Sequence, residues 1–194
     1  MLSSDLIEPH DVVMTGENSF IRLSADGGKT VVDRLSHWRV LWSPAGQGHA
    51  LFIDSTLTGA QPRIYTDNAG VARFLQRTIE TLLYKGFGAE SLPLIDAKFE
   101  RSGNSLSTVH ERITSADDDI VMNWSDLGTP FLLNIAPGKR WPIGAHATLI
   151  PASDVQLTLN GKAAAAQPFT HTRYGDPVSD CCLAWSETWK RPRA

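Results

Sequence analysis

Three side chains in this sequence are of types that could together carry out acid–base chemistry: His110, Arg112 and Glu187. An imidazole exchanges protons near neutral pH, a guanidinium binds carboxylates or enolates, and a buried carboxylic acid can give or take a proton. This trio predicts a catalytic site in which His110 carries the proton and Arg112 holds an anion. The alternative is a structural ion pair, or Arg112 at the rim of a sheet with its head in water.

A turn at Gly103-Asn104 determines where these side chains point. If these two residues form the whole turn, the strands predicted over 93–101, 106–114 and 119–124 make a sheet with one apolar face. We expect that face to lie inward, and it would carry Ile95, Ala97, Phe99, Thr108, His110, Arg112, Met122 and Trp124. Phe99, Met122 and Trp124 would then contact a ligand. The opposite face, with Asp96 and Glu111, would lie in solvent.

Glu187 lies on the last predicted strand, 181–189, on the same side as Leu183, Trp185 and Trp189. If this side is internal, burial favours the neutral acid, a nearby Arg112 favours the carboxylate, and Trp185 contacts the ligand. The alternative is that the two tryptophans are exposed and form a binding patch.

A second pair of candidate residues comes from the hairpin predicted over 37–42 and 49–54. With Trp42 opposite His49, His37 would face Asp54. A carboxylate beside an imidazole orients the ring and raises its basicity, as acid–base sites require. The same pair is also a common surface contact.

The motifs of metal and cofactor binding are missing from the sequence. The histidines are spread without the close spacing of metal ligands, and Asp117-Asp118-Asp119 lacks the glycine and distal glutamate of a calcium loop. No glycine cluster of the dinucleotide type follows a predicted strand. The sequence therefore predicts no metal and no cofactor.

One strongly amphipathic helix must help to position these residues. Its apolar positions are spaced three and four apart between Asn68 and Tyr84, with Asn68 able to cap the first turn. The apolar stripe consists of Val71, Phe74, Leu75, Ile79, Leu82 and Leu83, and the opposite side carries Arg73, Gln76, Arg77 and Glu80. One apolar stripe means one buried face, so we expect the helix to pack on a sheet.

The rest of the chain reads as short strands separated by turn signals such as Asn160-Gly161. The predicted strands are 11–15, 19–24, 29–34, 37–43, 48–55, 61–66, 93–101, 106–114, 119–124, 130–135, 144–150, 154–159, 162–167 and 181–189. Many short strands favour closure, because closure removes exposed edges. We predict a mainly β fold: an antiparallel β-barrel or strongly bent sheet, calycin-like by analogy, with the helix packed on it.

Composition limits the range of functions. The 194 residues suit a single domain, with about eight N-terminal and about four C-terminal residues expected to be flexible. A net charge of −3 argues against a nucleic-acid partner, and no apolar run is long enough for a membrane helix. The adjacent cysteines, Cys181 and Cys182, are unlikely partners for each other in a disulfide. Without a signal-peptide pattern, these features predict a cytoplasmic protein.

Three functions are consistent with the sequence. The leading hypothesis is binding of a small, partly apolar molecule, which can carry an anionic group, inside the barrel. The second is a cofactor-free enzyme (isomerase, cyclase or hydrolase) that uses a His/Arg/Glu cluster. The third is a structural module in which tryptophans form the interface of a homo-oligomer.

Overall fold

The computed structural model describes residues 11–137, 141–173 and 176–192, and most of these residues belong to β-strands. In chain order the strands are β1 (Val12–Ser24), β2 (Val31–Trp42), β3 (Gly48–Asp54), β4 (Arg63–Thr66), β5 (Leu94–Asp96), β6 (Lys98–Asn104), β7 (Thr108–Thr114), β8 (Asp119–Leu127), β9 (Phe131–Ile135), β10 (Gly144–Leu159), β11 (Lys162–Ala163), β12 (Gln167–Pro168), β13 (Thr170–Arg173), β14 (Asp176–Ser179) and β15 (Cys182–Lys190). The expected flexible N-terminal segment lies outside the described residues, and so do Arg193 and Ala194.

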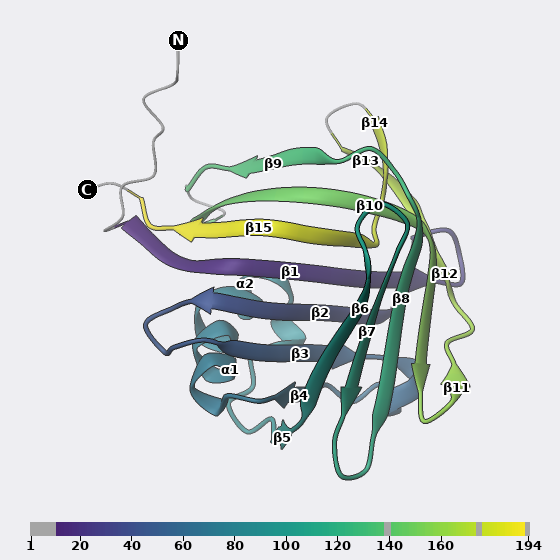
Figure 1. Cartoon of the computed structure of the whole chain (residues 1–194), viewed down its shortest axis with the longest axis horizontal. Helices are drawn as coiled ribbons and strands as arrows, with labels where there is room; N and C mark the ends of the chain where they lie inside the picture. The colour runs from purple at the N-terminus through teal and green to yellow at the C-terminus, as the bar shows by residue number, and fades with distance from the viewer. Residues whose placement is uncertain (1–10, 138–140, 174–175, 193–194) are drawn as a thin grey trace.

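One large sheet curls until its two edges approach each other (Figure 1). Its strands follow the order β5-β4-β3-β2-β1-β15-β10-β8-β7-β6, and β9, β11 and β12 pair along its sides. The sheet is therefore nearly closed into a barrel with one seam between β5 and β6. The predicted mainly β fold is confirmed, with one difference: β4 and β5 run parallel, so the sheet is mixed.

Several predicted short strands are continuous in the structure. The segments 11–15 and 19–24 form the single strand β1, 29–34 and 37–43 join in β2, and 144–150 and 154–159 join in β10. The two predicted segments of β10 are separated by Pro151, and at this residue the strand changes its pairing partner. Residues up to Pro151 pair with β15, and those from Ala152 onward pair with β8. Proline has no N–H to donate to a ladder, so it suits a point where the strand bends from one neighbour to another.

The predicted helix is confirmed, and it packs on the outer face of the sheet (Figure 1). It consists of α1 (Ala69–Leu75), a π-helical turn η3 (Gln76–Glu80) and α2 (Thr81–Leu83), and it is followed by the 3₁₀ turn η4 (Lys85–Phe87). A separate 3₁₀ turn, η2 (Thr56–Thr58), lies between β3 and β4. The Asn68 side chain caps its first turn by accepting from the N–H groups of Gly70 and Val71. Val71, Leu75 and Ile79 are fully buried, as expected for the apolar stripe.

Two residues assigned to the solvent side of the helix are buried instead. Gln76 and Glu80 are each 1% exposed. Gln76 is covered by the segment after the helix, because its Nε2 donates to the carbonyls of Phe87 and Ala89. Glu80 lies in the π turn, which widens the helix, and its carboxylate accepts from Ser36 and Trp38 on β2.

The described residues form two large apolar cores and a smaller third cluster around Ala147 and Leu149. The inner core fills the barrel and includes Leu51, Tyr65, Met122 and Trp124. The outer core lies between the helix and the strands behind it, where Trp38, Phe52 and Ile64 meet the helical stripe. Strands β1 to β4 therefore bury side chains on both faces.

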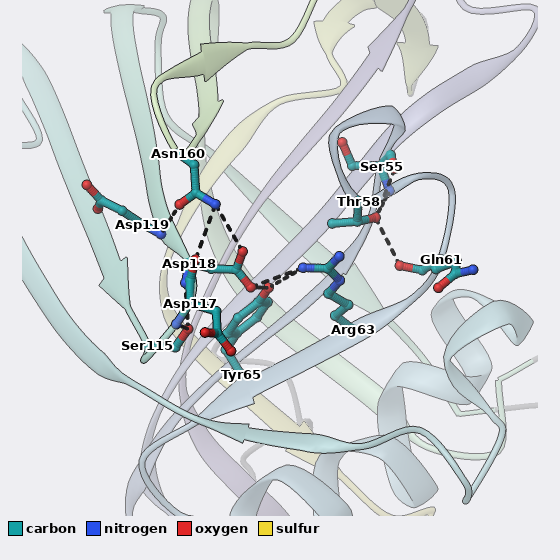
Figure 2. A network of polar contacts seen from close by, with 10 residues as sticks. All are labelled: Ser55, Thr58, Gln61, Arg63, Tyr65, Ser115, Asp117, Asp118, Asp119 and Asn160. Carbon is teal, nitrogen blue, oxygen red and sulfur yellow. Dashed lines mark hydrogen bonds and ion pairs between the residues drawn. The ribbon is translucent and has the colours of Figure 1, made fainter.

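A polar network ties the two sides of the seam together at one end of the barrel (Figure 2). The Tyr65 hydroxyl donates to Asp118 over 2.6 Å, and Nη1 of Arg63 donates to the same carboxylate over 3.0 Å. Asn160 donates to the other Asp118 oxygen over 3.2 Å. Strand β4, the turn after β7 and the turn after β10 are thus joined through one carboxylate.

Candidate functional site

The hairpin of β6 and β7 has a different register from the one predicted. Its loop is Ser105–Ser107, and Asn104 pairs with Thr108. The Asn104 side chain accepts from the N–H of Leu106, which moves the turn beyond Gly103-Asn104. The observed register differs from the predicted one by an odd number of residues, so the side chains of β7 exchange faces relative to β6.

His110 and Arg112 therefore lie on the outer surface, and the expectation that they point inward is wrong. Nδ1 of His110 is 2.6 Å from Oδ1 of Asn123. Arg112 donates two hydrogen bonds of 2.9 Å to Asp119. Glu111, predicted to lie in solvent, is 2% exposed and points into the barrel.

Glu187 and Trp185 do not share a face, contrary to the prediction. Ser186 between them has a φ of 56°, and the pairing of β15 with both neighbours is irregular in this region. A bulge of this kind reverses the alternation of side chains along a strand. Trp185 consequently faces the barrel, and Glu187 lies on the other face, where it accepts from the indole N–H of Trp189.

The predicted pair of His37 and Asp54 is also wrong. His37 lies opposite Leu51, and Asp54 lies opposite Arg34. The loop between β2 and β3 is long, so its sequence did not fix the register. Asp54 instead accepts a 2.8 Å hydrogen bond from the Tyr84 hydroxyl.

Met122 and Trp124 lie inside the barrel, as expected, and both are fully buried. The indole N–H of Trp124 donates to the carbonyl of Phe20 over 3.3 Å. Both belong to the packed inner core. Whether either contacts a ligand stays a prediction.

A different set of polar residues meets inside the barrel, where β6 crosses in front of β2 and β3 (Figure 1). They surround a cavity of about 450 Å³, which we call the edge pocket. It is lined by His37, Arg39, His49, Phe99, Arg101, Ser102, Gly103 and Glu111. His37 and Phe99 were predicted as ligand-binding residues, and the structure brings them together with ring centroids 5.6 Å apart.

His37 is the most unusual residue of the edge pocket. The residue is 2% exposed, yet neither ring nitrogen has a hydrogen-bond partner. The nearest carboxylate oxygen, Oε1 of Glu111, lies 3.7 Å from Nδ1. Burial lowers the pKa of His37 well below its usual value, and the neighbouring side chains of Arg101, His49 and Arg39 lower it further. The ring is therefore neutral, with one N–H donor and one nitrogen acceptor left unused.

Three rings of the edge pocket are nearly parallel. Phe99 lies 11° from the plane of His37 and 15° from that of His49. The two histidine rings differ by 8°, with centroids 6.4 Å apart. Phe99 stacks on both histidine rings, and the three rings form one aromatic stack that lines the pocket.

Arg101 forms the charged part of the edge pocket. Nη1 donates to Glu17 over 2.6 Å, Nε donates to Glu111, and the guanidinium lies 4.6 Å above the Trp185 ring. Burial raises the pKa of Glu111, although Arg101 acts in the opposite direction. The cluster links β1, β6 and β7 across the barrel.

His49 stands at the rim of the edge pocket with an orienting carboxylate. Its Nδ1 is 2.6 Å from Oδ2 of Asp67, and its backbone N–H donates to the other Asp67 oxygen over 2.6 Å. The carboxylate leaves Nε2 as the nitrogen available for another partner, an arrangement that serves proton transfer.

Sequence reasoning missed Arg101, Glu111 and His49 as site residues. A usable signal was present for Glu111, which lies between Val109 and Ile113 in alternation. Two β-branched residues at that spacing mark the buried face of a strand, and a glutamate between them lies on the same face. For Arg101 and His49 the partners come from distant strands, and no local pattern indicates them.

Within the described ranges, no helix has the length and apolar content needed to span a membrane. The same residues include no group of three or more His, Cys, Asp or Glu side chains placed to hold a metal ion. Neither described cysteine forms a disulfide.

No protein-family model, curated protein or solved structure matches this chain. The calycin-like analogy therefore stays a prediction. Function is inferred from the fold and from the side chains of this chain.

Proposed function

We propose that this protein binds a small, partly apolar molecule with an anionic group in the edge pocket of the barrel. The observation that carries the proposal is His37, a buried imidazole with two unpartnered nitrogens at a cavity. A buried polar group without a hydrogen bond costs about 1–3 kcal/mol. Such a cost is expected where a ligand supplies the partner.

The lining indicates the kind of ligand. The parallel rings of His37, His49 and Phe99 favour a flat apolar body. Arg39 lines the pocket, is exposed, and forms no ion pair with any described residue. A guanidinium at the mouth of an aromatic pocket suits a carboxylate. We therefore take an aromatic monocarboxylate as the ligand class.

The ligand site lies at the edge of the barrel because side chains already fill the rest of the interior. Around Trp124 the interior is filled by fully buried side chains. The edge pocket lies where β6 leaves the seam, so a ligand can enter without displacing that core.

Calorimetric titration with three probes of similar size tests the proposal: benzoate, benzyl alcohol and benzylamine. We expect benzoate to bind most tightly of the three probes. His37→Phe should raise the dissociation constant of benzoate by at least about tenfold, which corresponds to the loss of one hydrogen bond. His110→Phe is the matched control, because the same change on the outer surface removes an exposed imidazole. Equal binding by the wild type and His37→Phe would overturn the proposal.

A cofactor-free enzyme is the second candidate function, and the paired His49 and Asp67 favour it. In this reading His49 transfers a proton to and from a ligand held by Arg39. Hydrogen–deuterium exchange at the β-carbon of phenylpyruvate, followed by NMR, tests it. We expect acceleration by the wild type and a loss of about 10²-fold or more in His49→Gln. Retained exchange in that variant would exclude His49 as the base.

A further inference from the structure

A second cavity lies on the other face of the sheet, separate from the edge pocket. It has a volume of about 560 Å³ and lies between the helical segment ending at Phe87 and strands β9, β10 and β15. We call it the back cleft. Its apolar walls include Phe20, Leu133, Ala147, Leu149 and Trp189. These residues have no part in the binding site proposed above.

Two buried glutamates line the back cleft. Oε1 of Glu80 accepts from both the Ser36 hydroxyl and the Trp38 indole over 2.5 Å. Burial raises the pKa of Glu80 to about 7 and that of Glu187 to about 8. Because Oε1 of Glu80 already accepts two bonds, a proton on this acid resides on Oε2.

Arg34 is a cation at the same cavity without a salt-bridge partner among the described residues. Its guanidinium lies 4.6 Å above the Tyr84 ring. Burial lowers the pKa of Arg34, and the nearby Arg22 lowers it further. By contrast, Arg22 is paired with Asp180 at 2.7 Å. A partly buried guanidinium that lacks an anion, beside an acid that can be neutral, is a site for an external carboxylate.

We infer that the back cleft binds an aliphatic monocarboxylate. Its head group pairs with Arg34 and accepts a hydrogen bond from protonated Glu80, and its hydrocarbon chain lies against Phe20, Leu133 and Leu149. The walls of the back cleft combine leucine, isoleucine and alanine side chains with the rings of Phe20 and Trp189, and such a mixed apolar lining can accommodate a flexible hydrocarbon chain.

The protonation of Glu80 makes this binding depend on pH. Above a pH of about 7 the ionised Glu80 repels the ligand carboxylate. The other charged or titratable groups at the cleft are Arg22 and Arg34, which attract the ligand, Glu187, which acts in the same direction as Glu80, and Tyr84. Asp180 lies beside Arg22 and is already paired. Binding should therefore weaken as pH rises.

Calorimetric titration of the full chain with octanoate, octanol and octylamine tests the inference. We expect octanoate to bind at least about tenfold more tightly than the other two at a pH near 6, and to weaken by about tenfold or more toward pH 9. Arg34→Gln should remove the preference for octanoate. Glu80→Gln should keep octanoate binding, because the amide is neutral and can still donate, and should reduce the pH dependence to the share that comes from Glu187. Tighter binding of octylamine would overturn the inference.

Two tryptophan substitutions on β9 separate a filled cleft from a damaged fold. Leu133→Trp fills the back cleft from its wall and should abolish octanoate binding. Leu132→Trp places the same ring on the opposite face of β9, where Leu132 is 79% exposed, and should leave octanoate binding unchanged. Thermal denaturation verifies that both variants fold. Octanoate binding that survives Leu133→Trp in a folded protein would contradict the inference. Benzoate binding should survive it, so the two sites fail independently.

Discussion

The buried imidazole of His37 lowers the stability of the folded protein. Its two unpartnered nitrogens lose contact with water on folding and gain nothing from the protein. Phenylalanine has nearly the same shape and no polar atoms. We therefore expect His37→Phe to raise the free energy of unfolding by about 1–3 kcal/mol, measured by chemical denaturation. His110→Phe should change it by less than about 0.5 kcal/mol. A His37→Phe protein that is less stable than the wild type would show that the imidazole has an unseen structural partner.

Glu187 should give the protein an unusual pH dependence of stability. Its pKa is about 8 in the folded state and 4.5 in the ordinary reference state. The unfolded chain therefore loses this proton first, and the folded state becomes less stable as pH rises from about 4.5 to about 8. Glu187→Gln removes this contribution, so its stability relative to the wild type should increase with pH, by about 4 kcal/mol at the upper end.

A matched control for this effect is Glu90→Gln. Glu90 is exposed, and the hydrogen bond from Arg77 lowers its pKa, so its contribution to stability changes only below a pH of about 4.5 and stays constant across the range compared. Chemical denaturation across this pH range compares the three proteins. The explanation is contradicted if wild type and Glu187→Gln show the same slope of stability against pH.

At the scale of elements, the hairpin of β6 and β7 depends on Gly103. This glycine has a φ of 86°, and a Cβ there would lie 2.0 Å from the carbonyl oxygen of Thr108. Gly103→Ala should therefore destabilise the protein by about 2–4 kcal/mol. Gly161 has a similar φ of 77° with open space around it, so Gly161→Ala should cost only about 1 kcal/mol. Denaturation midpoints give the comparison, and equal losses would mean that the contact with Thr108 relaxes freely.

The sequence predicted the elements better than their registers. The helix was readable because its stripe recurs at three and four residues and Asn68 supplies a cap. The inward direction of Phe99, Met122 and Trp124 was also readable. The directions of His110 and Arg112 were not, because they depend on a loop that is longer by one residue than its Gly-Asn signal suggests. The bulge at Ser186 has no local signature, so the face of Glu187 was unreadable as well.

At the scale of the whole molecule, closure of the sheet depends on contacts across the seam. Asp118 accepts from Tyr65 and Arg63 and also contacts Asn160 (Figure 2). Burial raises the pKa of Tyr65 to about 12, so its hydroxyl remains a donor. We expect Asp118→Ala to destabilise the protein by about 2–4 kcal/mol and to speed amide exchange in β5 and β6. Asp117→Ala, on the same turn, is the control, because its exposed carboxylate accepts none of these bonds. Unchanged exchange in β5 and β6 would mean that the seam is held elsewhere.

The barrel itself was predictable because many short strands need an arrangement that hides their edges. Its strand order was not, since β15 inserts between β1 and β10 from the far end of the chain.

The third hypothesis, an oligomer interface made by tryptophans, needs exposed tryptophans other than Trp185 and Trp189. Trp189 is 2% exposed, whereas Trp42 is 49% exposed beside the equally exposed Leu41. The oligomer interface stays a prediction, and the exposed tryptophan that could form it is Trp42, at the end of β2.

The two edge strands of the sheet follow each other directly in the chain, with only Ala97 between them. The N–H of Ala97 donates to the Thr66 carbonyl over 3.0 Å, and Asp118 fastens the same end. Beyond Ala97, β6 pairs with β7 and not with β4 or β5, so this hairpin leaves the edge strand that precedes it. The salt bridge from Arg101 to Glu17 joins β6 to β1 on the other side of the barrel. The opening of the sheet is thus bridged by charged contacts at two separate points, Asp118 and Arg101.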